Sequence, residues 1–314
     1  MVEWHVDDRP AHPYTRLYTA AMWARRDKSA FEGAANTLRA ARKRQARGDV
    51  PPTRWTRWVR RVVEREKDGM RVWAVRPRRA SPAVRVVYFH GGGYVHPLTK
   101  DYWRLVRALT SDRESPAEVI LPAYPLAPDA TADDVLPKLV DLVRSFGDDT
   151  APPTVLMGDS AGGALVLAIA TQLRDLDAAA ARPAGLVLLS PWLDATLDER
   201  QVADLEASDP MLAETGLRAA GRWWAGERRR PSDPLVSPVH ADLRGLPPTD
   251  LFIGRHDILR PAVDDLVDHA VRDGLDLRGH EVTAMFHVWM TRAIPEGART
   301  RRQLRRILRR VAAA

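Results

Sequence analysis

A serine between small residues is the first part of this chain that could do chemistry. Ser160 lies in the stretch 158–163 (Gly-Asp-Ser-Ala-Gly-Gly), after the apolar run 154–157 and before the helix-compatible apolar run 164–170. A sharp strand-to-helix turn would present the hydroxyl, and small neighbours leave room for its strained backbone. The free N–H groups that begin a helix can stabilise negative charge. The pattern predicts a nucleophilic serine; a tight turn with a solvated serine is the alternative.

Three successive glycines could supply hydrogen-bond donors. Gly91 and Gly92 lie in the stretch 90–94 (His-Gly-Gly-Gly-Tyr), after the β-branched run 84–89. We predict that their N–H groups and that of Ala161 bind an oxyanion, where such a donor contributes about 3–4 kcal/mol. A flexible loop is the alternative. A phosphate cradle is disfavoured, because no Gly-Lys-Ser/Thr follows and no Gly-x-Gly-x-x-Gly opens a helix. We expect His90 to hold the loop by hydrogen bonds.

A serine nucleophile requires a base, and the base requires an orienting carboxylate. Asp257 follows a strand predicted over 249–253, and His287 follows one predicted over 277–284. Like Ser160, both come after the carboxyl end of a strand, where open α/β sheets gather their functional residues. The chain therefore predicts a Ser160–His287–Asp257 triad.

Other residues could replace the acid or the base. Asp250 is the main rival acid, but it would begin a strand rather than follow one; Asp194 and Asp198 are more distant rivals. We interpret the remaining histidines as surface or satisfied buried residues: His5, His12, His96, His240, His256, His269 and His280.

Four segments in the same order resemble the hormone-sensitive-lipase group of bacterial α/β-hydrolases. They are 90–94, 158–163, 124–129 (Tyr-Pro-Leu-Ala-Pro-Asp) and 190–194 (Ser-Pro-Trp-Leu-Asp). The resemblance covers roughly residues 72–294, and the order serine, aspartate, histidine is typical of this fold. It implies a carboxylesterase or acyl hydrolase with a helical cap.

Carried over to this chain, the resemblance implies nucleophile Ser160, acid Asp257 and base His287. It also implies Gly91, Gly92 and Ala161 as oxyanion donors. Two departures are visible. The family often has a further aspartate after the acid, where this chain has Arg-Pro at 260–261, and His-Pro at 96–97 replaces the usual small residues after the glycines. We therefore expect a different pocket shape.

The pattern beyond about residue 70 alternates strands and helices, which predicts a mostly parallel sheet with helices on both faces. We expect an α/β-hydrolase catalytic domain of residues 51–194 and 231–314. Its strands are predicted over 70–75, 84–89, 118–123, 154–157, 185–189, 249–253 and 277–284. Its helices are predicted over 101–111, 132–145, 161–173 and 262–273, and a last amphipathic helix lies within 299–311.

Residues 1–50 and the insertion 195–230 do not follow this alternation. We expect an N-terminal helical cap segment and inserted cap helices that overhang the carboxyl ends of the strands. The candidate substrate-binding residues are Tyr18, Met22, Trp23, Tyr94, Met211, Trp224 and Val288. The alternative is that most of these side chains only hold the cap together.

Composition narrows the class of protein. The chain has 314 residues, 45% of them hydrophobic and 28% charged, which is ordinary for a soluble globular protein. No apolar run of about eighteen residues and no secretory leader are present, so we expect a cytoplasmic protein without an integral membrane segment. The absence of cysteine excludes disulfides, zinc–thiolate sites and a cysteine nucleophile. We expect no metal and no cofactor, and a homodimer is compatible with the sequence.

The net charge of +7 comes mostly from arginine, with clusters at 39–44 and 299–310. We interpret both as solvated basic faces and expect no nucleic-acid partner, because no nucleic-acid motif accompanies them. A basic surface could still steer anionic substrates.

These observations predict hydrolysis of small-molecule esters, with short- to medium-chain acyl groups, through an acyl-serine intermediate. Deacetylation of an amide, sugar, sterol or natural product would use the same triad. A non-hydrolytic small-molecule-binding protein on the same scaffold is the alternative from another class, and such proteins usually lose a triad member.

Overall fold

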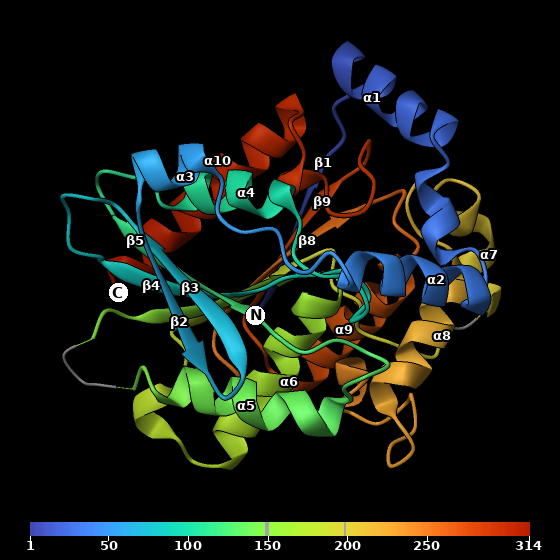
Figure 1. Cartoon of the computed structure of the whole chain (residues 1–314). Coiled ribbons are helices and arrows are strands. Elements are labelled where there is room, and N and C mark those ends of the chain that lie inside the picture. Colours follow the sequence, from blue (N-terminus) through green and yellow to red (C-terminus); the bar gives the residue numbers. More distant parts are fainter. Residues whose placement is uncertain (148–150, 198) are drawn as a thin grey trace.

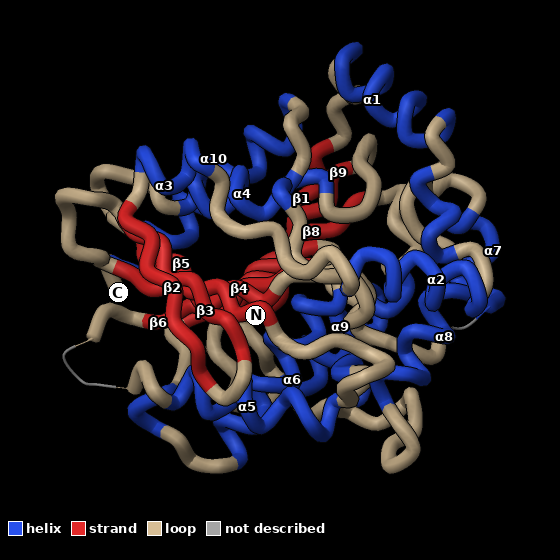
Figure 2. The backbone as a smooth tube through the Cα atoms, in the orientation of Figure 1, coloured by secondary structure: helices blue, strands red, loops and turns tan. Residues whose placement is uncertain are grey.

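The computed structural model describes residues 1–147, 151–197 and 199–314. These residues form a nine-stranded sheet in the order β1-β9-β8-β7-β6-β4-β5-β3-β2 (Figures 1 and 2). β2 pairs antiparallel with β3 and β3 with β5, while the other neighbours are parallel. The strands are β1 (Val2–Asp7), β2 (Arg61–Lys67), β3 (Met70–Arg76), β4 (Val84–Phe89), β5 (Ala117–Ala123), β6 (Thr154–Asp159), β7 (Gly185–Leu189), β8 (Thr249–Gly254) and β9 (Leu277–Val282).

Helices cover both faces of the sheet, as predicted. The α-helices are α1 (Pro13–Ala24), α2 (Ala34–Gln45), α3 (Arg54–Val59), α4 (Lys100–Leu109), α5 (Ala132–Arg144), α6 (Ala161–Asp175), α7 (Glu199–Glu206), α8 (Glu214–Ala225), α9 (Arg260–Asp273) and α10 (Pro295–Ala312). Short 3-10 helices include η1 (Asp27–Phe31) and η4 (Trp289–Thr291). No helix among the described residues combines the length and apolarity needed to cross a membrane.

The side-chain alternation of β4 explains the two layers. Val86 and Tyr88 belong to the apolar cluster that includes α4 and α10, whereas Val87 and Phe89 belong to the cluster that includes α5, α6 and α9. Successive side chains of a strand point to opposite faces, so a strand covered on both faces is apolar throughout. This pattern made the central strands recognisable in the sequence.

Two strands were not predicted, and both lie at edges of the sheet. β2 is mostly exposed and rich in arginine, lysine and glutamate, so it lacks an apolar signal. β1 pairs in parallel with β9, and the Trp4 ring packs so closely on Gly279 that a Cβ at 279 would overlap it. Residues 1–50, expected to be a helical cap segment, therefore begin with a strand of the sheet.

The N-terminal and inserted helices meet at one side of the sheet (Figure 1). α2 and η1 pack against α8, and α7 packs against the same helix. Gly216 of α8 lies so close to the Phe31 carbonyl oxygen and the Thr37 hydroxyl that a Cβ would overlap both. Segments far apart in sequence thus form one continuous helical layer.

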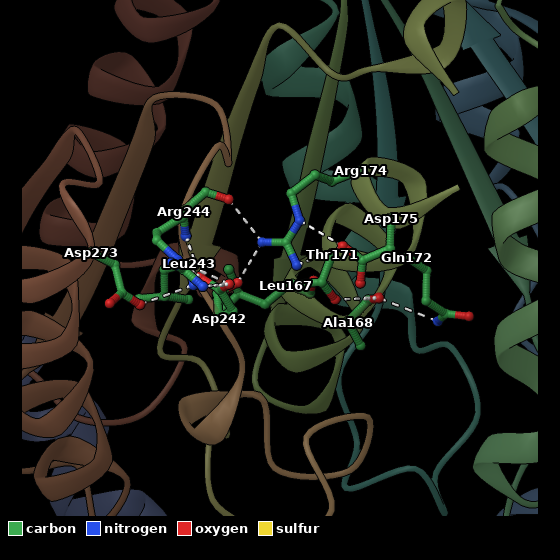
Figure 3. Close-up of polar contacts among 10 residues, drawn as sticks. All are labelled: Leu167, Ala168, Thr171, Gln172, Arg174, Asp175, Asp242, Leu243, Arg244 and Asp273. Atoms are coloured by element: carbon green, nitrogen blue, oxygen red, sulfur yellow. Dashed lines mark hydrogen bonds and ion pairs between the residues drawn. The ribbon is translucent and has the colours of Figure 1, made fainter. Parts of the chain in front are cut away.

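A polar cluster fixes α6 and α9 relative to the connection that leads into β8 (Figure 3). Arg174 of α6 donates hydrogen bonds to the carbonyl oxygens of Asp242 and Arg244, at 2.6 and 2.8 Å. The N–H of Leu243 donates to the carboxylate of Asp273, the last residue of α9, at 3.1 Å. Since α6 starts after Ser160 and α9 starts after Asp257, the cluster helps to hold the elements on which both residues depend.

Candidate active site

Ser160 occupies a strained turn between β6 and α6. Its φ is 53°, in the left-handed region that non-glycine residues rarely adopt. A Cβ at Gly158 would overlap the Gly162 carbonyl oxygen, and one at Gly162 would overlap that of Phe89. The predicted need for small residues around this turn is therefore confirmed.

Asp257 and His287 lie in the loops after β8 and β9. Both side chains are buried, and His287 Nδ1 lies 2.9 Å from Asp257 Oδ2. The other Asp257 oxygen accepts the N–H of Leu259 at 3.0 Å. Burial disfavours the imidazolium of His287, but Asp257, together with the charges of Asp209 and Asp159, outweighs burial and raises the pKa of His287 above its ordinary value. When Nδ1–H donates to Asp257, Nε2 is left as the basic nitrogen.

Ser160 and His287 line the same cavity, which has a volume of about 1080 Å³. The three glycines of the loop 91–93 line it too, so the predicted nucleophile, base and glycine loop are brought together. Because the Asp257 carboxylate lies within hydrogen-bond distance of the His287 ring, all three members of the predicted triad belong to one site.

The carboxylate of Asp159 connects the serine turn to the glycine loop. It accepts the hydroxyls of Tyr88 at 2.7 Å and Tyr102 at 2.9 Å, and the N–H of Gly91 at 3.0 Å. Burial raises the pKa of Asp159, although these hydrogen bonds oppose the shift. The tyrosines that complete this network were not predicted from the sequence.

The prediction that Gly91 donates to an oxyanion requires correction. Its N–H already points to Asp159 Oδ1 and to the Tyr102 hydroxyl, each 3.0 Å away. Among the described residues, no acceptor takes the N–H of Gly92, Gly93 or Ala161. The sequence could not reveal this difference, because the direction of each N–H depends on the tertiary partners of the loop.

The rival acids are engaged elsewhere. Asp250, near the start of β8, contacts Arg310 and lies 3.3 Å from His280 Nε2. Asp194 accepts hydrogen bonds from Thr196 and Ser237. Asp198 lies outside the described residues.

The rival histidines also have structural contacts. His90 stacks on Tyr124 with 4.4 Å between ring centroids, and its Nδ1 lies 2.7 Å from the Gly91 carbonyl oxygen. His12 accepts the N–H of Tyr14 at the start of α1, and His269 contacts the Val239 carbonyl oxygen. His96 differs from these residues, because it lines the cavity.

Of the seven predicted substrate-binding residues, Met211 and Val288 line the cavity; the other five do not. Tyr94 and Trp224 stack on each other with 4.2 Å between ring centroids, and both are buried. The remaining three divide between the core and the surface: Met22 is buried, Tyr18 stacks on Phe286, and Trp23 is exposed. For Tyr94, Trp224, Met22 and Tyr18, the alternative reading as cap and core packing fits, whereas the exposed Trp23 fits neither reading.

Residues that the sequence analysis missed complete the cavity. Phe31, Leu212 and Leu217 contribute apolar walls from η1, the insertion and α8. Asp209, which is buried, accepts the N–H of Ile258, the residue after Asp257, at 3.1 Å. Burial and the Asp257 charge raise the pKa of Asp209 to about 6. No local signal marked Asp209, because its role depends on a contact across 49 residues.

The described residues contain no group of three or more histidine, aspartate or glutamate side chains arranged to hold a metal ion.

Comparison with known proteins gives a consistent result. A family model for the alpha/beta hydrolase fold matches residues 86–291. An acetyl-hydrolase of Streptomyces hygroscopicus is 32% identical over 230 residues, which span 72% of this chain and 75% of that protein. The carboxylesterase/phospholipase LipF of Mycobacterium tuberculosis is 30% identical over 250 residues, which span 74% of this chain and 64% of LipF.

Solved structures agree with these matches. An esterase/lipase from an uncultured bacterium superimposes with a TM-score of 0.82 at 27% identity, covering 97% of this chain and 100% of that one. A structure of EstE5 soaked with p-nitrophenyl butyrate gives the same values. The chain belongs to the α/β-hydrolase family and is a carboxylic ester hydrolase.

Proposed function

We propose that this enzyme hydrolyses short- to medium-chain esters through an acyl-serine intermediate, with Ser160 as nucleophile, His287 as base and Asp257 as orienting acid. The observation that supports this best is the buried His287–Asp257 hydrogen bond, 2.9 Å long, beside the cavity that Ser160 also lines. A strained serine turn and an imidazole with one nitrogen engaged by a carboxylate are the elements of a serine hydrolase.

In this mechanism His287 Nε2 removes the Ser160 proton as the hydroxyl oxygen attacks the ester carbonyl. The imidazolium then donates that proton to the leaving alcohol, and an acyl-enzyme remains. Water, deprotonated by the same nitrogen, attacks the acyl-enzyme and releases the acid and Ser160. Asp257 fixes the tautomer throughout and stabilises the imidazolium, which agrees with the direction of the His287 pKa shift.

We assign the oxyanion to the N–H groups of Gly92, Gly93 and Ala161, replacing Gly91 in our sequence-based prediction. The support is that these donors have no acceptor among the described residues and adjoin the cavity or the serine turn. Gly91 acts instead as a support, because its bond to Asp159 holds the loop next to Ser160. Donors fixed before the reaction stabilise the developing charge without reorganisation.

The substrate range follows from the apolar walls and from the relatives. Phe31, Met211 and Leu212 give the cavity an acyl-binding surface. Because one relative is named an acetyl-hydrolase, removal of acetyl groups is a second candidate that uses the same residues. We propose that α2, η1, α7 and α8 form the cap over this cavity.

Replacing Ser160 tests the proposal directly. Ser160→Ala removes the attacking oxygen and is expected to lower kcat for p-nitrophenyl butyrate by about a thousandfold or more. The exposed Ser111 supplies the matched control, since Ser111→Ala should retain full turnover. A fluorophosphonate probe should label the wild type and the control but not Ser160→Ala. Undiminished turnover by Ser160→Ala, with the fold intact by circular dichroism, would exclude the serine mechanism.

A further inference from the structure

The walls of the catalytic cavity carry an excess of positive charge. Among its described lining residues, seven are arginine or lysine and four are aspartate or glutamate. Three of the arginines have carboxylate partners: Arg25 pairs with Asp27, Arg26 with Glu32, and Arg292 with Asp101. These pairs account for three of the four acidic residues. The fourth, Asp159, is buried in the network with Gly91 and the tyrosines.

The remaining four cations of the cavity have no carboxylate within ion-pair distance among the described residues: Lys43, Arg44, Arg47 and Lys100. Three of them come from α2 and the residues just after it. Other arginines of the same helix differ. Arg42 binds Asp129 and Arg39 donates to Asn36, and neither lines the cavity. Arg39 is therefore also without a carboxylate partner among the described residues, but it lies away from the cavity, whereas Lys43 and Arg44 of the same helix line it.

His96 is a second, independent feature of the cavity wall that points to a ligand. It lines the cavity, only 4% of its surface is exposed, and neither ring nitrogen has a hydrogen-bond partner among the described residues. Buried polar groups are normally hydrogen-bonded, and leaving one unpaired costs about 1–3 kcal/mol. The ring lies edge-on to Phe31, with 5.3 Å between centroids, so it is ordered in an apolar wall.

The positive charge of Arg44 acts electrostatically on the His96 imidazole. Burial and the neighbouring charge of Arg44 lower the pKa of His96 to about 3, so the imidazole is neutral at physiological pH and keeps one N–H donor. Arg44 is accessible from the cavity, yet desolvation by the surrounding protein lowers the pKa of its guanidinium. Arg44 is exposed and has no carboxylate within ion-pair distance among the described residues, so an exposed cation near an unused N–H donor matches the needs of an anion.

We propose that His96 and Arg44 form a subsite for the carboxylate or phosphate group of an anionic ester, with Lys43 and Arg47 adding positive potential. This rests on the proposed ester hydrolysis at Ser160. The subsite is tied to the oxyanion loop, because the N–H of His96 donates to the Gly92 carbonyl oxygen at 2.9 Å. An anion there relieves the mutual repulsion of the α2 cations and satisfies His96, so it strengthens binding of substrates that carry a second, negatively charged group.

The test compares matched anionic and neutral esters. On the acyl side, mono-p-nitrophenyl glutarate is compared with p-nitrophenyl pentanoate. On the alcohol side, 3-acetoxybenzoate is compared with 3-acetoxybenzamide. The quantity measured is the ratio of kcat/KM for the anionic ester to that for its neutral partner, so that differences in the amount of active enzyme cancel. The variants are Arg44→Gln and His96→Phe, and Arg39→Gln of the same helix is the control.

We expect the wild type to favour the anionic ester of at least one pair. Arg44→Gln and His96→Phe should each lower that ratio about tenfold through KM, as loss of one hydrogen bond to a charged group predicts. Added salt should lower the wild-type ratio more than that of Arg44→Gln. Arg39→Gln should keep the wild-type ratio.

Two results would overturn the subsite. In the first, neither variant changes the kcat/KM ratio of either ester pair from its wild-type value. In the second, the ratio falls in Arg44→Gln but stays at the wild-type value in His96→Phe. The second result would leave only diffuse electrostatic attraction. If Ser160→Ala still hydrolysed the neutral esters, the proposed function would fail first. Normal Ser160-dependent turnover of neutral esters without anion preference would overturn the subsite alone.

Discussion

At the scale of single residues, the site depends on carboxylates that do not touch the reacting ester. Asp159 orients the glycine loop through Gly91, and Asp257 orients His287. Asp209 accepts the N–H of Ile258 and so holds the loop that carries Asp257. Each carboxylate thereby fixes a backbone segment or an imidazole, and the proposed donors Gly92, Gly93 and Ala161 stay free for the oxyanion.

Asp209 should influence the pH dependence of catalysis. The base must be neutral to accept the Ser160 proton, so activity rises as pH passes upward through the His287 pKa. Burial lowers that pKa, and the charges of Asp257 and Asp209 raise it to a net value above the ordinary one. Asp209→Asn removes one of these charges, so the acidic limb of kcat/KM for p-nitrophenyl butyrate should move to lower pH. An unchanged limb would show that Asp209 does not act electrostatically on His287.

The same variant should change the stability profile. A buried carboxyl whose pKa is raised from 3.8 to about 6 is favoured in its protonated form by the folded state. Its ionisation therefore lowers wild-type stability as pH rises between these values. Asp209→Asn should lose this component of the pH dependence, which thermal unfolding from pH 4 to pH 7 would measure.

At the scale of elements, helices α6 and α9 must keep a fixed position for Ser160 and Asp257 to face the same cavity. Both helices begin near the carboxyl edge of the parallel sheet, where the site lies, and are tied together at their far ends by the cluster around Arg174 (Figure 3). Because a helix is stiff, contacts at one end help to define the position of the other.

Arg174→Ala should therefore lower stability more than it lowers activity at room temperature. The substitution removes hydrogen bonds to the Asp242 and Arg244 carbonyl oxygens, and a loss of about 1–3 kcal/mol is expected for bonds to a charged donor. Denaturant unfolding would measure it. Arg182→Ala, which removes only an exposed ion pair with Asp177, is the control and should change stability by less than about 1 kcal/mol. Equal effects of the two variants would contradict a special role for Arg174.

At the scale of the whole molecule, one segment that precedes the catalytic core and one inserted within it build the proposed cap. The N-terminal segment begins with β1, which pairs with β9 in the sheet, and its cap helices follow β1 along the chain. Its helices then meet α8, where Gly216 allows close contact with η1 and α2 (Figure 1). The cavity lies between this layer and the triad, so its shape and charge are properties of the assembled molecule.

The Gly216 contact should control cap closure. In Gly216→Ala the new methyl group meets the Phe31 carbonyl oxygen, and the helices must separate. Overpacking of this kind costs about 1–3 kcal/mol. Since Phe31 lines the cavity, we expect KM for p-nitrophenyl butyrate to rise more than kcat falls. Gly185→Ala, where φ is not positive and the added Cβ would make only ordinary contacts at 3.5 Å, controls for loss of glycine alone. A KM equal to that of the wild type would mean that this contact does not shape the cavity.

Features that local backbone chemistry encodes could be predicted from the order of the amino acids. Ser160 needed small neighbours at a strand–helix turn, and apolar runs identified the central strands. Asp257 and His287 could be placed because each follows such a strand. The edge strands β1 and β2 were not predicted. Each pairs with a neighbour on one side only and is largely exposed, so its sequence carries little apolar signal.

Which polar groups are free and which are engaged became visible only in the folded chain. Gly91 and Gly92 are neighbours of the same type, yet Asp159 takes the N–H of one and leaves the other free. Tyr94 and Trp224 have suitable side chains for a pocket but stack away from the cavity, whereas His96 and Arg44 line it. The physical reason is that hydrogen-bond partners, burial and uncompensated charge arise from contacts between distant segments, which local residue patterns do not specify.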